Sequence, residues 1–179
     1  DRSVPGLADE FQRTLDWFGF EWDGSVCFQS DRIDLYEDSL RALQRAGRCY
    51  PCRCSRSRLA SLALEPGIEP VYPGTCRHDP AAATGPHALR FAIEPDQPAV
   101  EFVDELQGPV RQDCLREAGD FVVRRRDGQF AYHLAVVVDD ELQGVTEVTR
   151  GCDLLTSTPR QILLQRALEL RRPRYAHLP

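Results

Sequence analysis

The sequence of 179 residues is long enough for one hydrophobic core, or for a core with a small additional module. Its 42% hydrophobic and 28% charged residues are typical of a globular protein, and no run of about 18 apolar residues predicts a membrane span. The net charge of −6 argues against a broad basic surface for nucleic acid. Three short arginine clusters could still contact phosphates, although each one alone favours a solvated basic spot: Arg53–Arg58, Arg124–Arg126 and Arg171–Arg174.

The first part of the sequence predicts two helices. Asp9 can cap a first helix that ends at Gly19, and Ser30 can cap a second helix that ends at Gly47. Apolar residues recur at helical spacing in both: Phe11, Leu15 and Phe18 in the first, and Ile33, Tyr36, Leu40 and Leu43 in the second.

A cysteine-bearing segment follows these helices. Residues 49–54 (CYPCRC) predict a short extended piece, and Ser55 can cap a small helix that runs to Leu64. Residues 65–85 are rich in proline and glycine and show little periodicity. An irregular stretch of this length inside a compact domain is usually functional or held in place by another group.

The second half of the sequence predicts strands. Residues 88–93, 99–104 and 109–113 read as short strands, and Asp127-Gly128 indicates a hairpin turn between two strand-like runs. The run 135–142 is ambiguous between strand and helix, and 144–150 predicts a strand that ends at Arg150-Gly151. After Thr158-Pro159, the run 160–170 predicts an amphipathic helix. This order of elements favours an α/β fold with an inserted small module.

The seven cysteines predict metal ligands rather than disulfides. Their odd number, their uneven spacing and the absence of a secretory signal at the start indicate a reducing compartment. Cys52, Cys54 and Cys76 are candidate zinc ligands, and either Tyr72 or His78 could complete a tetrahedron. Ligand chemistry alone favours the imidazole of His78. The alternative is three unconnected reduced thiols, some of them buried as small hydrophobic side chains.

Several segments carry a resemblance to a known family. CYPCRCSRSRL, VYPGTCR, the long run from GDFVVRRRDGQFAYHLAVVV to RQILLQRALEL, and the final YAHLP closely resemble the glutamyl-tRNA synthetase catalytic domain. Within that family the sequence is most similar to the glutamyl-Q tRNA(Asp) synthetase subfamily. The resemblance implies an α/β fold, a Rossmann-like class I aminoacyl-tRNA synthetase core with a small zinc-bearing insertion. Residues 1–48 and 119–179 would form the core, and 49–118 the inserted, acceptor-binding-like module.

The resemblance also implies an activity. Members of the subfamily are ligases that activate L-glutamate with ATP and Mg²⁺ and transfer it to the queuosine base at the wobble position of tRNA(Asp). The expected protein is a cytoplasmic monomer with one structural Zn²⁺ and no membrane partner. Two alternatives stay open: a catalytic-domain fragment of a full glutamyl-tRNA synthetase, and a non-catalytic zinc-stabilised module that binds RNA or protein.

Carried over by motif, the resemblance places two glutamate-binding residues at Tyr132 and Arg150. An arginine can grip a carboxylate with two parallel hydrogen bonds, and a strand end in an α/β sheet is a usual place for a ligand. Without the family, Tyr132 would be a core or hairpin tyrosine and Arg150 an ordinary strand-end arginine. The resemblance also places the zinc ligands at Cys52, Cys54, Tyr72 and Cys76, with His78 as the alternative to Tyr72.

Other polar residues receive no functional role from the sequence. Asp139 and Asp140 predict a solvated turn, and His133 and His177 show no partner, so no catalytic residue is assigned. The sequence contains no methionine and neither the HIGH-type nor the KMSKS-type segment with which the family binds ATP. The natural N-terminus is therefore expected to lie outside this sequence, and the 179 residues alone are expected to be insufficient to form the adenylate.

Overall fold

The computed structural model describes residues 4, 6–61, 70–79, 81, 84–96 and 98–179. The chain divides into two compact units, Asp1–Asp31 and Arg32–Pro179, which are described separately below. None of the described helices combines the length and the apolar character that a bilayer span requires.

The first unit contains helix α1 (Leu7–Trp17), and the 3₁₀ helix η1 (Gln29–Arg32) begins near its end. The residue that caps α1 is Gly6, so the prediction that Asp9 is the cap was wrong. Asp9 lies in the first turn, where its negative charge still interacts favourably with the helix dipole. Of the apolar residues that defined the helix in the sequence, Phe11 and Phe18 are exposed, Phe11 with 65% of its surface accessible, and Leu15 is partly buried.

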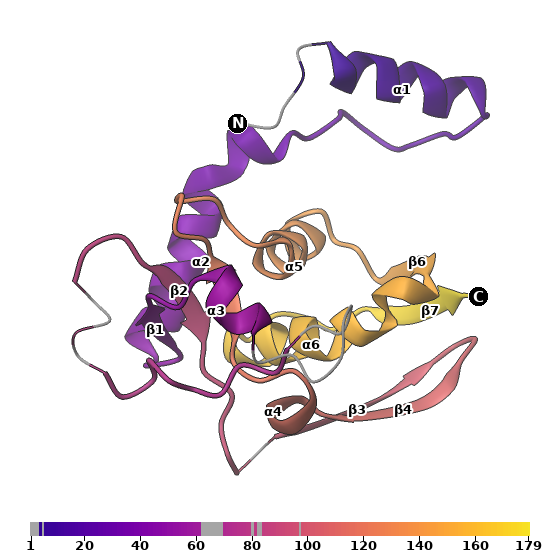
Figure 1. Cartoon of the computed structure of the whole chain (residues 1–179). Helices are drawn as coiled ribbons and strands as arrows, with labels where there is room; N and C mark the ends of the chain where they lie inside the picture. The colour runs from indigo at the N-terminus through magenta and orange to yellow at the C-terminus, as the bar shows by residue number, and fades with distance from the viewer. Residues whose placement is uncertain (1–3, 5, 62–69, 80, 82–83, 97) are drawn as a thin grey trace. The chain divides into compact units, whose positions relative to one another are not determined.

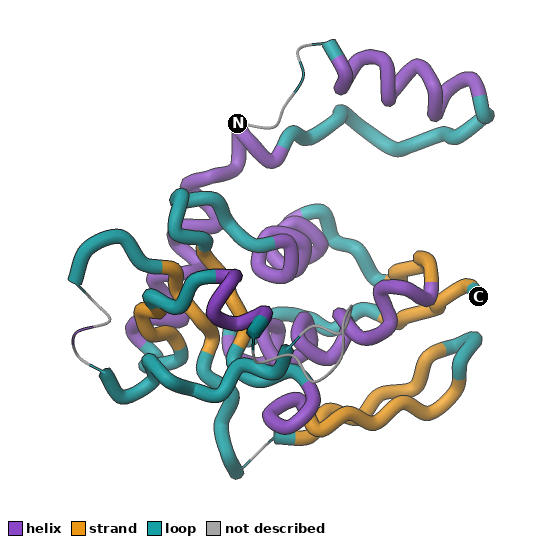
Figure 2. The backbone as a smooth tube through the Cα atoms, viewed as in Figure 1, coloured by secondary structure: helices purple, strands orange, loops and turns teal. Residues whose placement is uncertain are grey.

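The second unit is built from helices around two small sheets (Figures 1 and 2). Its helices are α2 (Ile33–Arg45), α3 (Arg56–Ala60), α4 (Cys114–Glu117), α5 (Tyr132–Leu142), η3 (Cys152–Ser157) and α6 (Thr158–Ala167). Its strands are β1 (Cys49–Cys52), β2 (Ala88–Phe91), β3 (Ala99–Asp104), β4 (Gly108–Asp113), β5 (Phe121–Arg124), β6 (Glu147–Gly151) and β7 (Arg174–Leu178).

The predicted caps of α2 and α3 had different outcomes. Arg32 occupies the cap position of α2, so the prediction for Ser30 was wrong, and the Ser30 hydroxyl instead donates to Asp31. The prediction for Ser55 is confirmed, because its hydroxyl accepts a hydrogen bond from the backbone N–H of Arg58. Helix α3 ends at Ala60, and most of the predicted remainder lies outside the described residues.

One sheet has the strand order β1-β2-β5 and is antiparallel. The other has the order β4-β3-β7-β6, in which β3 and β4 form an antiparallel hairpin while β3, β7 and β6 run parallel to one another. The hairpin and the strands β6 and β7 are visible at the right of Figure 1. The parallel arrangement brings the carboxyl ends of β3, β7 and β6 to the same edge of the sheet.

The predicted hairpin around Asp127-Gly128 is half correct. The chain does reverse there, with an isolated bridge between Arg124 and Phe130, but the second arm becomes helix α5 instead of a strand. Residues on several sides of α5 are buried, including Leu134, Val137 and Val138, which explains why the apolar run shows no clear period.

The prediction that Asp139 and Asp140 lie in a solvated turn was also wrong. Both are within α5, and Asp139 is buried against α2, where it accepts hydrogen bonds from Tyr36 at 2.9 Å and from Arg32 at 2.8 Å. This contact fixes the α2–α5 pair. Burial and the hydrogen bond to Asp139 raise the pKa of Tyr36 to about 12, so the phenol is the hydrogen-bond donor.

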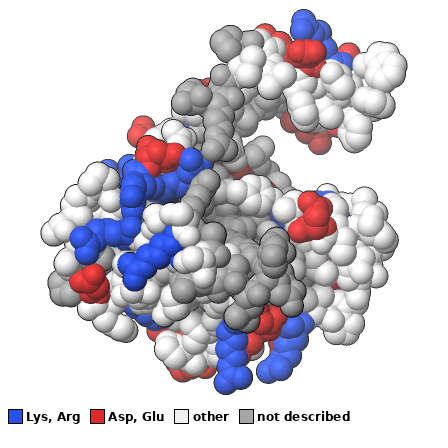
Figure 3. Space-filling view, in the orientation of Figure 1, with Lys and Arg blue, Asp and Glu red and all other residues white. Residues whose placement is uncertain are grey.

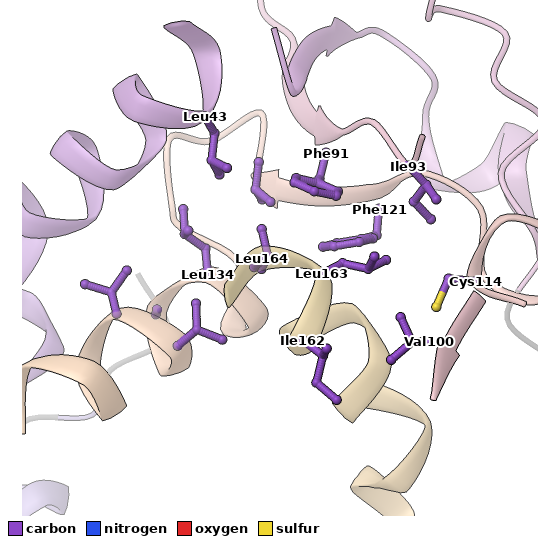
Figure 4. Close-up of a cluster of buried hydrophobic side chains, with 14 of the residues drawn as sticks. Leu43, Phe91, Ile93, Val100, Cys114, Phe121, Leu134, Ile162, Leu163 and Leu164 are labelled. Atoms are coloured by element: carbon purple, nitrogen blue, oxygen red, sulfur yellow. The ribbon is translucent and has the colours of Figure 1, made fainter. Parts of the chain in front are cut away.

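The larger of two described clusters of buried hydrophobic residues connects the two sheets. Helix α6 lies at its centre and is buried on most sides, so the amphipathic pattern predicted for it was wrong. In Figure 4, the α6 side chains Leu163 and Leu164 lie close to side chains from other elements, with the stacked rings of Phe91 and Phe121 above them. The two sheets therefore share one core through this helix.

Candidate functional site

The structure brings Tyr132 and Arg150 together. Tyr132 begins α5 and Arg150 lies near the carboxyl end of β6, and the guanidinium Nη1 donates to the Tyr132 hydroxyl at 3.2 Å. The Tyr132 side chain is accessible, with 47% of the residue surface exposed, so the pair borders solvent. An exposed guanidinium edge beside a phenol at a sheet's carboxyl edge is suited to an anionic ligand.

Three further groups hold the Arg150 guanidinium from behind. Its Nη2 donates to the Thr158 hydroxyl and to the Gln161 side-chain oxygen, each at 2.8 Å, and its Nε lies 3.0 Å from His177 Nε2. Thr158 and Gln161 come from the first turn of α6, and His177 is paired with Arg150 in the β6–β7 register. Sequence reasoning missed all three.

His177 in turn contacts a buried carboxylate. Its Nδ1 lies 2.5 Å from Asp104 Oδ2, and both side chains are fully buried. Burial alone would raise the pKa of Asp104, but hydrogen bonds from His177 and from backbone N–H groups outweigh it and lower that pKa to about 2. Asp104 is thus a carboxylate, placed at the last residue of β3. A sequence signal was present only for Asp104, which ends the predicted strand 99–104, whereas no strand was predicted around His177.

A second cluster contains the cysteines singled out in the sequence. The Sγ atoms of Cys52, Cys54 and Cys76 all lie within 4.8 Å of one another. The Tyr72 hydroxyl lies 3.4 Å from Cys52 Sγ and 3.9 Å from Cys54 Sγ. His78 is exposed and does not belong to this group of potential ligand atoms among the described residues. The structure therefore gathers three thiols and the phenol, and leaves the imidazole outside.

These residues fit a tetrahedral zinc ion. Zn–S bonds of about 2.3 Å imply sulfur–sulfur distances of about 3.8 Å in a tetrahedron, and Cys54 and Cys76 are 3.7 Å apart. Burial raises the pKa of Cys54, whereas hydrogen bonds from backbone and side-chain groups overcome burial at Cys76 and lower its pKa to about 7. At least one thiol is therefore prepared to lose its proton, as a metal ligand must.

Arg90 supports the cysteine cluster from β2. Its guanidinium carbon stands 3.7 Å from the centre of the Tyr72 ring, and its Nε donates to Cys52 Sγ at 3.3 Å. A second group of its guanidinium donates to the backbone oxygen of Asp120. A positive charge is thus held between the Tyr72 ring and the Cys52 sulfur.

Gly119 allows the Tyr72 segment to approach β5. The backbone of Tyr72 forms a parallel bridge with Gly119, whose φ is +67°. A Cβ at this position would lie 2.7 Å from the Tyr72 carbonyl oxygen. A residue with a side chain would therefore meet both a strained φ and a backbone clash.

A cavity of about 970 Å³ extends from the cysteine cluster to Tyr132. Its lining includes four arginines and two aspartates, an excess of positive charge that favours an anionic occupant: Arg90, Arg125, Arg126, Arg160, Asp120 and Asp127. Figure 3 shows that basic side chains of the second unit gather at its left and lower edges, next to acidic ones. On this face the basic groups form local patches, which agrees with the short arginine clusters of a chain whose net charge is −6.

Comparisons with known proteins identify relatives of this chain. A protein from Dechloromonas aromatica named glutamyl-Q tRNA(Asp) synthetase is 51% identical over 99% of this chain and 59% of its own length. A protein of the same name from Geobacter sulfurreducens is 50% identical over 99% of this chain and 57% of its own length. The chain thus spans less than two thirds of these relatives.

The fold matches solved structures as well. A crystal structure of a glutamate tRNA ligase from Elizabethkingia meningosepticum, in complex with its amino acid, aligns with a TM-score of 0.80 at 24% identity, over 99% of this chain and 40% of that chain. This likeness shows the predicted α/β class I synthetase fold. The model of the catalytic domain of class I tRNA synthetases (E and Q) matches residues 1–179. The chain belongs to this family.

Proposed function

We propose that the protein containing this chain activates L-glutamate with ATP and Mg²⁺ and transfers it to queuosine in tRNA(Asp). The relatives at 50% and 51% identity bear the name of that activity. The single structural observation that carries the proposal is the Tyr132–Arg150 pair at the open carboxyl edge of β6. We assign both side chains to the glutamate subsite, where Arg150 would bind a carboxylate.

The geometry also supports a proposal for which part of Arg150 would meet the ligand. The guanidinium can grip a carboxylate with two parallel N–H groups, but its Nε and Nη2 already point at His177, Thr158 and Gln161. The Nη1 edge, next to the Tyr132 hydroxyl, is the accessible side. The ligand carboxylate would therefore share Nη1 and the phenol instead of taking the whole guanidinium fork.

The zinc site is a second part of the proposal. Cys52, Cys54, Cys76 and Tyr72 would hold one structural ion, which would tie segment 70–79 to strand β1. The proposed division into a core, residues 1–48 and 119–179, and an inserted module, residues 49–118, places this ion in the module. The cavity between the cluster and Tyr132 gives the nucleic acid substrate a route to the glutamate subsite.

The test uses the natural full-length protein and measures glutamate-dependent ATP–pyrophosphate exchange. The variant Arg150→Ala should raise KM for glutamate about 100-fold, since a hydrogen bond to a charged group contributes about 1.5–3 kcal/mol. Tyr132→Phe should raise it about tenfold. The matched control Arg111→Ala removes an exposed arginine that pairs only with Glu101 among its described salt bridges, and should leave KM unchanged.

The acceptor is tested separately with purified tRNA. Glutamylation of tRNA(Asp) that contains queuosine, and none of the same tRNA without it, is the expected result. Glutamate attached to the 3′ end of tRNA(Glu) would instead support a full glutamyl-tRNA synthetase. Exchange that proceeds without glutamate, or binding of RNA with no exchange at all, would refute the proposed activity.

A further inference from the structure

The buried pair of Asp104 and His177 forms a chain of hydrogen bonds that ends at Arg150. Asp104 Oδ1 accepts three backbone N–H groups, from Leu106, Gln107 and His177, at 3.0–3.1 Å. Its other oxygen, Oδ2, faces His177 Nδ1 at 2.5 Å. The carboxylate is thus fixed by the β3–β4 turn and by β7, with one oxygen reserved for the imidazole.

This geometry assigns the tautomer of His177. A carboxylate only accepts, so Nδ1 must carry the hydrogen that faces Asp104. The Nε–H of Arg150 only donates, so the Nε2 of His177, 3.0 Å away, must be an acceptor. Both requirements are met by a single form of the ring, with hydrogen on Nδ1 and a lone pair on Nε2.

The His177 ring also helps to fix the orientation of the Arg150 guanidinium. His177 takes the Nε–H, while Thr158 and Gln161 accept from Nη2. Among the described residues, Tyr132 is the hydrogen-bond partner of Nη1. With the rear edge occupied, the guanidinium plane cannot rotate without breaking hydrogen bonds, and Nη1 stays directed at the open side.

We infer that Asp104 and His177 are positioning residues that orient Arg150 for its carboxylate ligand by fixing the imidazole in its Nδ1–H form. The inference rests on the proposed function, in which Arg150 binds glutamate. It adds to that function two buried residues, on β3 and β7, that are not among the residues lining the cavity.

The simpler explanation is that the pair only joins neighbouring strands. Asp104 and Tyr175 are partners between β3 and β7, and Arg150 and His177 between β6 and β7, so the hydrogen bonds do span three strands. A purely structural role predicts that stability falls while glutamate binding by the folded protein is unchanged. A positioning role predicts a change in binding that depends on the tautomer.

The isosteric variant Asp104→Asn separates the two roles. Its Oδ1 can still accept the three backbone N–H groups, but its amide would donate to His177 Nδ1. The ring must then place its hydrogen on Nε2, where it opposes the Nε–H of Arg150. KM for glutamate should rise about 10- to 100-fold with a much smaller change in kcat, because an interaction common to bound substrate and transition state is weakened.

Two histidine variants refine the test. His177→Gln can place a carbonyl oxygen near the position of Nε2 and accept from Arg150, so it should restore much of the affinity that His177→Leu loses. The matched control is Asp113→Asn, which changes an aspartate that caps α4 and has no contact with this chain of groups. Asparagine caps as well as aspartate, so KM and stability should both be unchanged.

The tautomer of His177 can also be measured directly, without any substrate. Long-range ¹H–¹⁵N NMR of the ligand-free, histidine-labelled full-length protein should show Nδ1–H at His177, identified by its loss in His177→Gln. Asp104→Asn should move the hydrogen to Nε2. A native ring with hydrogen on Nε2 would overturn the inference, as would an Asp104→Asn protein that is folded, switched in tautomer and normal in KM.

Failure of the inference and failure of the proposed function are distinguishable. If Arg150→Ala raises KM but Asp104→Asn and His177→Leu do not, the positioning role of Asp104 and His177 is refuted and the glutamate assignment stands. If Arg150→Ala itself leaves KM unchanged, the glutamate assignment is refuted. The positioning role of Asp104 and His177 is then refuted with it, even if NMR finds the expected tautomer.

Discussion

The charged residues at the carboxyl edge of the parallel strands differ in the groups that surround their charges. Arg150 is held by four partners, none of which is a carboxylate, whereas the buried carboxylate Asp104 is satisfied by backbone N–H groups and by His177. The positive charge is therefore restrained in direction without being paired in a described salt bridge. This is the condition in which a bound carboxylate gains most from an arginine.

The lowered pKa of Asp104 makes a prediction about acid stability. Its pKa falls from 3.8 to about 2 on folding, so its contribution to stability is complete above pH about 4 and is lost as the pH falls toward 2. At about 1.4 kcal/mol per pKa unit, that contribution is about 2 kcal/mol. Urea unfolding between pH 7 and pH 2 should show the loss, and Asp104→Asn should flatten it. Equal slopes for both proteins would contradict the assignment.

At the scale of elements, the cysteine cluster joins β1 to the segment around Tyr72. We predict that the purified protein carries about one zinc ion per chain, and that Cys52→Ser removes most of it, since a structural site needs its full ligand set. Metal analysis by mass spectrometry measures this directly. Cys27→Ser is the control, because Cys27 is exposed and outside the cluster. Zinc that is retained in Cys52→Ser, or lost equally in Cys27→Ser, would contradict the predicted site.

The elements also show what could be read from the sequence. Strands β3 and β6 and the cap of α3 were predicted correctly, because alternation and capping are local signals. The start of helix α5 was misread as the arm of a hairpin, and the run 135–142 was left open between strand and helix. A run that is buried on several sides shows neither the helical nor the strand period. Tyr132 and Arg150 were predicted through family resemblance, while Asp104 and His177 were missed because parallel pairing with β7 joins residues that are distant in sequence.

At the scale of the second unit, one core serves both sheets. Its members come from β2 and β5 of one sheet and from β3 and β7 of the other, with α6 between them. The unit should therefore unfold cooperatively, without one sheet melting ahead of the other.

A substitution that creates a cavity at the centre of this core tests that expectation. Leu164 is fully buried in α6, and Leu164→Ala should lower the free energy of unfolding by about 2–5 kcal/mol. Denaturation followed by far-UV circular dichroism and by tyrosine fluorescence should shift by the same amount. The control Leu106→Ala removes the same atoms from a side chain that is 55% exposed, and should change little. Separate transitions for the two probes would disprove a shared core.

The close approach at Gly119 restricts how this sequence can vary. The hydrogen atom that stands there in place of a side chain lets the backbone of Tyr72 lie against the start of β5. Even the smallest replacement, a methyl group, would push away the chain that carries the phenol toward the thiols. Which residues position 119 tolerates is thus decided by the backbone of Tyr72, and a substitution there would first displace the Tyr72 phenol from the three thiols.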